Sequence, residues 1–431
     1  MLIHVVQQGD TIYTIAEQYG ISAERIIQDN ELSDPNNLAL GQTIVILYPN
    51  RTYTVQEGDT LGQIAQSQDV TELQLLRNNP SLGERDFLYP GETLVIDYDT
   101  EKLGTLSING YAYPFIDRTV LRKTLPYLTY LSIFTYGFSA DGELIPIDDT
   151  ELIQMAKEYQ VAPIMVLATL QADGTFSSEV AHTVFTDLEA QSKLIENIIT
   201  NMRNKGYVGV DVDFEFVEPE DKQGFLDFVS RLHNRASQEG FIVTVALAPK
   251  TSIGQVGLLY EAHDYAGFGA IADSVLLMTY EWGYTYGPPM AVAPINKVRE
   301  VLDFGVTQIP PEKITMGIPN YAYDWPLPFV RGETRAQSMG NVEATEQAAR
   351  VGAAIRFDEL AQTPTYNYVN NSTGTPVQHE VWFEDARSIN AKIKLVGEYG
   401  LEGIGIWQIM RFFPQMWLVI NPQYNIEKLS S

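Results

Sequence analysis

The sequence predicts a (β/α)8 barrel, a TIM barrel of the α/β class, preceded by two small modules. Three observations lead to this prediction. The first hundred residues contain one pattern twice. Beyond residue 104, eight short apolar runs alternate with segments of helical periodicity. A stretch of about 324–385 is longer than an ordinary loop between barrel elements. A doubly wound sheet is the alternative for the same alternation.

The composition narrows the classes of function. The 431 residues include 55 acidic and 28 basic side chains, a formal net charge of −27, and no cysteine. This excludes a protein that binds nucleic acid by neutralising phosphates, and it excludes thiolate chemistry. No apolar run approaches the length of a membrane span, and the N-terminus resembles no signal peptide. We expect no membrane span and no standard export signal.

The repeat defines the N-terminal modules. VVQQGDTIYTIAEQYGIS from residue 5 matches TVQEGDTLGQIAQSQDVT from residue 54, and Asn30 corresponds to Asn79. The Gly-Asp-Thr segments predict a turn and a helix N-cap. Each copy therefore predicts a strand, two short helices and a closing strand.

Both copies, residues 1–49 and 50–98, resemble the LysM module through the pattern V-x-x-GDT…IA…N…L-x-x-GQ-x-I-x-I. The resemblance implies binding to N-acetylglucosamine-containing glycans, in a groove between the first strand–helix turn and the second helix–strand loop. The acidic charge favours the neutral sugar backbone over an anionic polymer. A spacer with capped turns is the alternative.

The eight apolar runs of residues 104–431 are the expected barrel strands. In chain order they are 106–113, 130–138, 162–170, 207–217, 241–249, 273–282, 313–323 and 401–410. Two of the intervening segments show a clear helical stripe. One stripe consists of Phe225, Phe228, Val229, Leu232 and Ala236. The other consists of Leu188, Ile195, Ile198, Ile199 and Met202.

The segment 324–385 contains a helix-like part (342–355) and a hairpin pattern, TYNYV followed by HEVWF. It follows the seventh predicted strand, on the face where barrel active sites form. We expect an insertion that forms one wall of a substrate groove.

The fourth predicted strand, YVGVDVDFEFV, carries three carboxylates on one face. A period of two places Asp211, Asp213 and Glu215 opposite the valines, so they would line the barrel interior. Buried carboxylates are costly unless paired, protonated or used. We expect Asp211 and Asp213 to share a proton and Glu215 to be held partly neutral as a donor. A strand facing water and a three-carboxylate metal cluster are the alternatives; no two of the five histidines have ligand spacing, and we expect no metal.

This strand resembles the DGxDxDxE signature of glycoside hydrolase family 18, the chitinase-like enzymes, and the resemblance covers about 104–431. Asp211, Asp213 and Glu215 fill the last three acidic positions, with Glu215 at the general acid. Val208 stands at the first acidic position of the signature. This departure concerns the tuning of the pKa values of the remaining carboxyl groups more than catalysis itself.

Two further motifs agree with this family. Met278-Thr279-Tyr280-Glu281 resembles its M-x-Y-D motif, with Glu281 in place of Asp, and Trp407 matches the tryptophan beneath the reacting sugar. Core packing is the alternative for each aromatic residue, and the glycine pair typical of the third strand is absent. The remaining candidates for sugar contacts, all near predicted strand ends, are Tyr113, Tyr136, Asn320, Tyr321, Glu281 and Met278.

The family resemblance implies retaining hydrolysis without a protein nucleophile or cofactor. Glu215 would protonate the glycosidic oxygen while the 2-acetamido group of the substrate attacks the anomeric carbon. Asp213 would hold the acetamide N–H, and Tyr280 its oxygen.

The LysM-like pair, the absent export signal and the forms VDVDFEFV and MTYEWGY together resemble the spore cortex-lytic group, N-acetylglucosaminidases that degrade peptidoglycan fragments in germination. The resemblance implies a spore-associated monomer, made in the cytoplasm, whose partner is peptidoglycan or a chitin-like glycan. A chitinase and a non-catalytic glycan-binding barrel are the alternatives; the acid at Glu215 favours catalysis.

Overall fold

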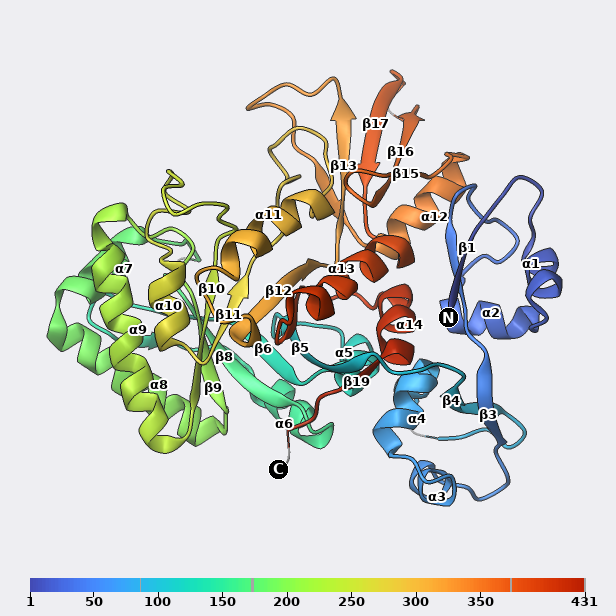
Figure 1. The fold of residues 1–431 in the computed structure, drawn as a ribbon, viewed down its shortest axis with the longest axis horizontal. Coiled ribbons are helices and arrows are strands. Elements are labelled where there is room, and N and C mark those ends of the chain that lie inside the picture. The colour runs from blue at the N-terminus through green and yellow to red at the C-terminus, as the bar shows by residue number, and fades with distance from the viewer. Residues whose placement is uncertain (86, 172–173, 373, 430–431) are drawn as a thin grey trace.

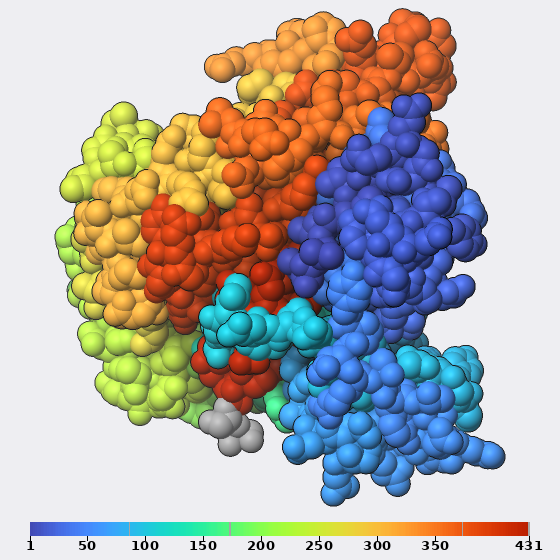
Figure 2. Space-filling view, turned by 45° about the vertical axis from the view of Figure 1, so that its right-hand side comes forward, coloured from blue at the N-terminus to red at the C-terminus, as the bar shows by residue number. Residues whose placement is uncertain are grey.

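The protein, seen here as a computed structural model, is described over residues 1–85, 87–171, 174–372 and 374–429. A ring of parallel strands lies at its centre, with helices packed around it (Figure 1). Two small N-terminal modules pack along one side of this barrel (Figure 2). No helix in the described ranges is long and apolar enough to cross a membrane.

The predicted barrel is confirmed. Within the described residues eight parallel strands pair in the order β5-β18-β12-β11-β10-β9-β8-β6, and pairing of β5 with β6 closes the ring. The strands are β5 (Gly104–Ala112), β6 (Tyr130–Phe138), β8 (Ala162–Ala168), β9 (Gly209–Asp213), β10 (Ile242–Leu247), β11 (Ser274–Leu277), β12 (Ile314–Pro319) and β18 (Gly403–Trp407). Short strands β7 (Leu144–Ile145) and β19 (Tyr424–Ile426) extend the sheet at β6 and β5.

Helices connect the strands and cover the outside of the barrel. They are α5 (Arg118–Thr124), α6 (Thr150–Glu158), α7 (Ser178–Thr186), α8 (Leu188–Lys205), α9 (Lys222–Ala236), α10 (Tyr265–Ile271), α11 (Ile295–Gly305), α13 (Ala386–Tyr399) and α14 (Pro414–Gln423). The predicted stripe of α9 is buried in full. In α8 the prediction was wrong for Leu188, which is 55% exposed because it follows the N-cap Asp187 at the solvent-facing start of the helix.

Several strands end earlier than the sequence pattern predicts. The pairing of β9 stops at Asp213, so Glu215 lies beyond the strand. Likewise β11 ends at Leu277, and Tyr280 and Glu281 belong to the loop that follows. Glu281 has φ 67°, a left-handed conformation that a strand cannot contain. The candidate site residues are therefore presented by strand ends and loops.

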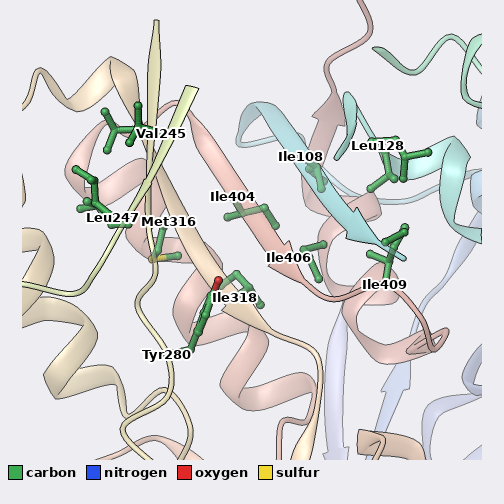
Figure 3. Close-up of a cluster of buried hydrophobic side chains, with 14 of the residues drawn as sticks. Ile108, Leu128, Val245, Leu247, Tyr280, Met316, Ile318, Ile404, Ile406 and Ile409 are labelled. Carbon is green, nitrogen blue, oxygen red and sulfur yellow. The ribbon is translucent and has the colours of Figure 1, made fainter. Parts of the chain in front are cut away.

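The apolar core follows the two-residue period of the strands. One set of side chains faces the surrounding helices, and Figure 3 shows part of it, with Ile404 and Ile406 on β18 and Met316 and Ile318 on β12. A second, smaller set faces the barrel axis. It contains Tyr111, Phe134, Val166, Ala246 and Leu276.

Each N-terminal module has the predicted strand–helix–helix–strand order. The first contains β1 (Leu2–Val5), α1 (Ile12–Tyr19), α2 (Ala23–Asn30) and β2 (Thr43–Ile46), and the second β3 (Pro49–Thr54), α3 (Leu61–Ser67), α4 (Glu72–Asn78) and β4 (Thr93–Tyr98). Thr11 and Thr60 cap the first helix of each module. The repeated asparagines lock helix to strand: Asn30 exchanges hydrogen bonds with Val45, and Asn79 with Val95. These bonds explain why the same amide recurs in both copies.

The modules are built into the barrel domain. Val45 and Leu47 of the first module belong to the main core. Lys123 of α5, 6% exposed, donates to Glu31 of the first module at 2.7 Å and to Glu84 of the second at 2.9 Å. One buried cation thus joins both modules to the barrel.

The insertion after the seventh barrel strand is confirmed. It contains β13 (Ala322–Leu327), β14 (Gln337–Met339), α12 (Asn341–Val351), β15 (Arg356–Asp358), β16 (Thr363–Asn370) and β17 (Val377–Trp382). Strands β16 and β17 form the predicted hairpin; its turn includes residue 373, which lies outside the described residues. The first module touches this insertion: a Cβ at Gly41, whose φ is 82°, would lie 2.0 Å from the carbonyl oxygen of Ile355.

Candidate active site

The acidic face of β9 points into the barrel, as its alternation predicts. Val210 and Val212 face the helices and are fully buried, which turns Asp211 and Asp213 toward the axis. Glu215, two residues further, is half-buried at the mouth of the barrel. The three carboxyl groups therefore lie at successive depths along the axis.

Asp211, the deepest of the three, is fully buried and held by two hydroxyl groups. Thr244 donates to its Oδ1 at 2.6 Å, and Tyr111 donates to its Oδ2 at 2.9 Å. Burial raises the pKa of Asp211, and these two hydrogen bonds oppose the rise. Sequence reasoning missed Tyr111 and Thr244. Tyr111 could have been found, because it lies two residues before Tyr113 in the predicted strand 106–113 and so has the same parity.

Asp213 and Glu215 open into a common cavity. The cavity holds about 270 Å³ and is lined by Asp213, Glu215, Pro249, Leu259, Tyr260, Met278, Tyr280, Glu281 and Trp407. Burial, and then the charges of Glu215 and Asp211, raise the pKa of Asp213 well above its ordinary range. Burial raises the pKa of Glu215 too, and the charge of Glu281 adds to it. Each of the two carboxyl groups therefore gives up its proton less readily than it would in water.

Asp213 has one oxygen without a partner. Among the described residues, nothing forms a hydrogen bond with its Oδ1, although this atom is buried. A buried acceptor left unpaired is costly and rare. Because Asp213 lines the cavity, its carboxyl group still has acceptor capacity on that side of the barrel.

Tyr280 reaches the cavity from the loop after β11. Its ring lies over Gly317 of β12, where a Cβ would come within 2.6 Å of its Cε1. Figure 3 shows Tyr280 at the edge of the buried core, beside Ile318. Core packing and contact with the cavity, which the sequence left as alternatives, are both true of this ring.

Glu281 lies at the rim of the cavity, and two tyrosines hold its carboxylate. Tyr321 and Tyr323 both donate to Oε1, the latter at 3.1 Å. These bonds oppose the rise that burial causes in the pKa of Glu281. Tyr321 therefore reaches the site through Glu281, and Tyr323 is a member that sequence reasoning missed.

Trp407, at the end of β18, is one of the residues that line the cavity. Its ring packs edge-on against Phe134 at 4.9 Å between centroids and against Tyr113 at 6.1 Å. Phe115, 76% exposed, stacks on Tyr113 at 5.2 Å. Together with Met278 these rings form an aromatic surface that continues outward from the cavity.

Two predicted sugar contacts are wrong. Tyr136 is 1% exposed, and its hydroxyl is bonded to Asp149 and Lys205 in the layer between barrel and helices. On β6, Tyr136 belongs to the face of the strand that meets the helices, so its side chain points away from the barrel axis. Asn320 is 5% exposed, and its amide donates to the carbonyl oxygens of Gln408 and Arg411. It holds the segment after Trp407 in place and has no donor left for a sugar.

Within the described residues, no group of three or more His, Asp or Glu side chains is arranged to hold a metal ion. What the cavity offers is three carboxyl groups of raised pKa, those of Asp213, Glu215 and Glu281, together with a phenol and an indole ring. Such a set performs proton transfer beside a ring-shaped polar ligand, which is the work of a glycosidase.

Comparison with known proteins defines the class. The model of glycosyl hydrolases family 18 matches residues 116–411, and the LysM domain model matches residues 4–47 and 53–97. The chain belongs to family 18 of the glycosyl hydrolases and carries two LysM domains. It is a glycosidase.

Several relatives align with the chain over nearly its whole length. The chain is 37% identical over 431 residues to the cortical fragment-lytic enzyme of Bacillus subtilis (strain 168), and the alignment covers 99% of each chain. It is 34% identical over 435 residues to the protein of the same name from Bacillus anthracis, with the same coverage. The crystal structure of the spore cortex-lytic enzyme SleL from Bacillus megaterium QM B1551 matches with a TM-score of 0.83 at 38% identity, covering 99% of both chains.

Proposed function

We propose that this glycosidase cleaves peptidoglycan of the bacterial spore cortex beside an N-acetylglucosamine residue, and that it acts at the spore. The relatives named for cortex lysis align with the chain from end to end, LysM domains included. The LysM domains supply binding to the same class of glycan as the barrel cleaves.

One observation carries the proposed chemistry. Asp213, whose Oδ1 is buried without a hydrogen-bond partner among the described residues, lines the same cavity as Glu215, Tyr280 and Trp407. An acetamido group on a sugar brings one N–H donor and one carbonyl acceptor. The N–H would satisfy Asp213, and the phenol of Tyr280 would donate to the carbonyl oxygen. This pair of contacts selects an N-acetylated sugar.

The reaction then proceeds by substrate assistance. Glu215, whose pKa is raised by burial and then by the charge of Glu281, donates its proton to the glycosidic oxygen as the bond to the anomeric carbon breaks. The acetamide oxygen forms the new bond to that carbon, giving an oxazolinium ion. Asp213 offsets the positive charge as a carboxylate. Besides burial and the charge of Glu215, the charge of Asp211, one step deeper, raises the pKa of Asp213. Glu215 then takes a proton from a water molecule whose oxygen attacks the anomeric carbon. The bond between this carbon and the acetamide oxygen breaks, and the anomeric configuration is retained.

The other cavity residues bind the sugar. We propose Trp407 as the floor beneath the reacting sugar, with Met278 and Tyr113 extending this apolar surface and Glu281 accepting from sugar hydroxyl groups at the rim. Tyr321 orients Glu281. An aromatic floor suits a pyranose, because the C–H face of the ring packs on the π surface while its hydroxyl groups remain hydrogen-bonded.

We propose residues 1–49 and 50–98 as two glycan-binding units and residues 104–431 as the catalytic unit, with an insertion at about 324–385. One chain carries both kinds of site, and we propose that it works as a monomer. Two weak sites held at a fixed distance from the cleft raise the effective concentration of a polymeric substrate.

The test is an analysis of products. Purified cortex fragments and, separately, chitin oligomers are incubated with the full chain, and the products are identified by mass spectrometry. We expect cortex fragments to be cleaved faster, with N-acetylglucosamine at the new reducing end. Preferred cleavage of chitin oligomers would indicate a chitinase instead, and binding without cleavage of either substrate would indicate a glycan-binding barrel.

A further inference from the structure

His263 is fully buried behind the strand that carries the acidic residues, and the proposed reaction does not use it. It precedes α10 and follows the long loop after β10. A buried imidazole is uncommon unless its nitrogen atoms are satisfied. Both ring nitrogens of His263 have partners, and both partners belong to the backbone of the barrel.

The two hydrogen bonds determine the protonation of the ring. The backbone N–H of Ala248 donates to Nδ1 at 2.8 Å, so Nδ1 must be an acceptor. Nε2 lies 3.0 Å from the carbonyl oxygen of Phe214, which can only accept, so Nε2 must carry the proton. The geometry thus requires the neutral ring protonated at Nε2. Burial lowers the pKa of His263 to about 4, which keeps this form at higher pH.

The two partners lie just beyond the ends of neighbouring strands. The β9–β10 ladder pairs Asp211 with Thr244 and Val212 with Val245, and the strands end at Asp213 and Leu247. Phe214 and Ala248 are the next residues. The imidazole therefore connects the segments that follow β9 and β10, beyond the point where the two strands pair.

The bridged carbonyl belongs to the peptide group that joins Phe214 to Glu215. Because a peptide group is planar, holding its oxygen also fixes its nitrogen, which is the backbone nitrogen of Glu215. The Phe214 ring is held on the other side by stacking on Phe225 and Phe228, with centroids 5.4 and 5.8 Å away. The start of the Glu215 side chain is therefore fixed although the residue lies outside the strand.

We infer that His263 is a positioning residue for the reaction: through the Phe214 carbonyl it fixes the backbone from which Glu215 reaches the glycosidic oxygen. The inference rests on the proposed role of Glu215. The bond to Ala248 joins the same ring to the residue before Pro249, a wall of the cavity. A buried ammonium holds the imidazole's own backbone, since Lys250 donates to the carbonyl oxygen of His263 at 3.0 Å. One ring thus sets the spacing between the acid and the facing wall.

Two substitutions separate the two hydrogen bonds. Glutamine places an N–H donor as far along the side chain as Nε2, so His263→Gln keeps the bond to Phe214. Asparagine places an acceptor at the distance of Nδ1, so His263→Asn keeps the bond to Ala248 and loses the donor. Phe268→Leu serves as a packing control, because Phe268 is fully buried against Phe225 at 4.7 Å and contacts neither backbone group.

The full-length variants are assayed for kcat and KM on purified cortex fragments and for Tm. We expect His263→Asn to lower kcat about 10-fold with KM within about twofold, and His263→Gln to retain kcat within about threefold. The control should keep kcat despite a comparable loss of Tm. In a Glu215→Gln background, His263→Asn should cost less than about twofold further, because the two residues act in series.

Three results would overturn the inference. The first is equal kcat for the asparagine and glutamine variants. The second is a loss of kcat in Phe268→Leu as large as in His263→Asn at a similar loss of Tm. The third is an asparagine variant that fails to fold, which would make the ring a structural element only. These results are distinct from failure of the proposed function. If the wild-type chain cleaves cortex fragments and Glu215→Gln does not, the function stands whatever His263 does.

Discussion

Replacing Glu215 by glutamine tests the centre of the site with almost no change of shape. The amide has the volume of the carboxyl group but can neither donate an acidic proton nor accept one from water. The proposed reaction uses Glu215 in both steps, and a positioned acid or base contributes about 10²- to 10⁴-fold. We expect kcat to fall at least about 100-fold, which corresponds to about 2.7 kcal/mol of transition-state stabilisation. KM should change little, since Trp407, Tyr280 and Asp213 remain.

Stability measurements distinguish this loss from unfolding. The pKa of Glu215 is raised in the folded protein, so its carboxyl group favours folding most at low pH, and this contribution is lost as the pH rises through the folded pKa. Glutamine titrates nowhere in this range. Relative to wild type, the variant should gain stability between pH 4 and neutral pH, when Tm is measured across that range.

The assay follows cleavage of purified cortex fragments by chromatography, together with equilibrium binding of the same fragments. A variant that binds normally, is at least as stable at neutral pH and turns over 100-fold more slowly agrees with the proposed role. Near-normal turnover would refute it, because the proposed mechanism assigns both proton transfers to Glu215 alone.

Three further predictions concern the surroundings of this residue. Glu281→Gln removes a charge that raises the pKa of Glu215, so the alkaline limb of the pH–kcat/KM profile should move to lower pH; an unmoved limb would show that Glu215 does not set it. A thiazoline analogue of N-acetylglucosamine should inhibit competitively, because it copies the oxazolinium ring; indifference to it would favour a different mechanism. Lys123→Met leaves Glu31 and Glu84 without their cation. Since both carboxylates keep contact with water, it should lower the free energy of unfolding by about 1–2 kcal/mol and weaken retention on insoluble cortex, measured by denaturant titration and co-sedimentation; unchanged values would mean that the modules dock without this ion bridge.

The docking of the LysM domains changes what a truncation would measure. Deletion of residues 1–98 would be the simplest test of whether the modules retain the protein on glycan. In the structure Val45 and Leu47 are part of the main core, and Asn78 accepts from Asn421 of α14 at 2.8 Å. Removing the modules would expose apolar surface and take both carboxylate partners from Lys123. Point substitutions in the glycan grooves are therefore the cleaner test of retention.

The order of elements could be predicted because each depends on local periodicity. Short apolar runs identified all eight strands, and the alternation of side chains identified the face of β9 that bears Asp211 and Asp213. The same reasoning failed for Tyr136. There, the apolar strand is buried on both faces, so alternation cannot say which face meets the axis.

By itself, the sequence determined the repeated modules, the barrel, the place of the insertion and the acidic strand, since turns, caps and side-chain periods act between residues close along the chain. Only the tertiary structure decided which groups share the cavity. Tyr111 and Asp211 are 100 residues apart, and Phe214 and His263 are 49 apart, yet each pair is hydrogen-bonded. Closing the ring of strands brings such residues together, and the burial that follows raises the pKa of the carboxyl groups; neither effect is encoded in any short segment.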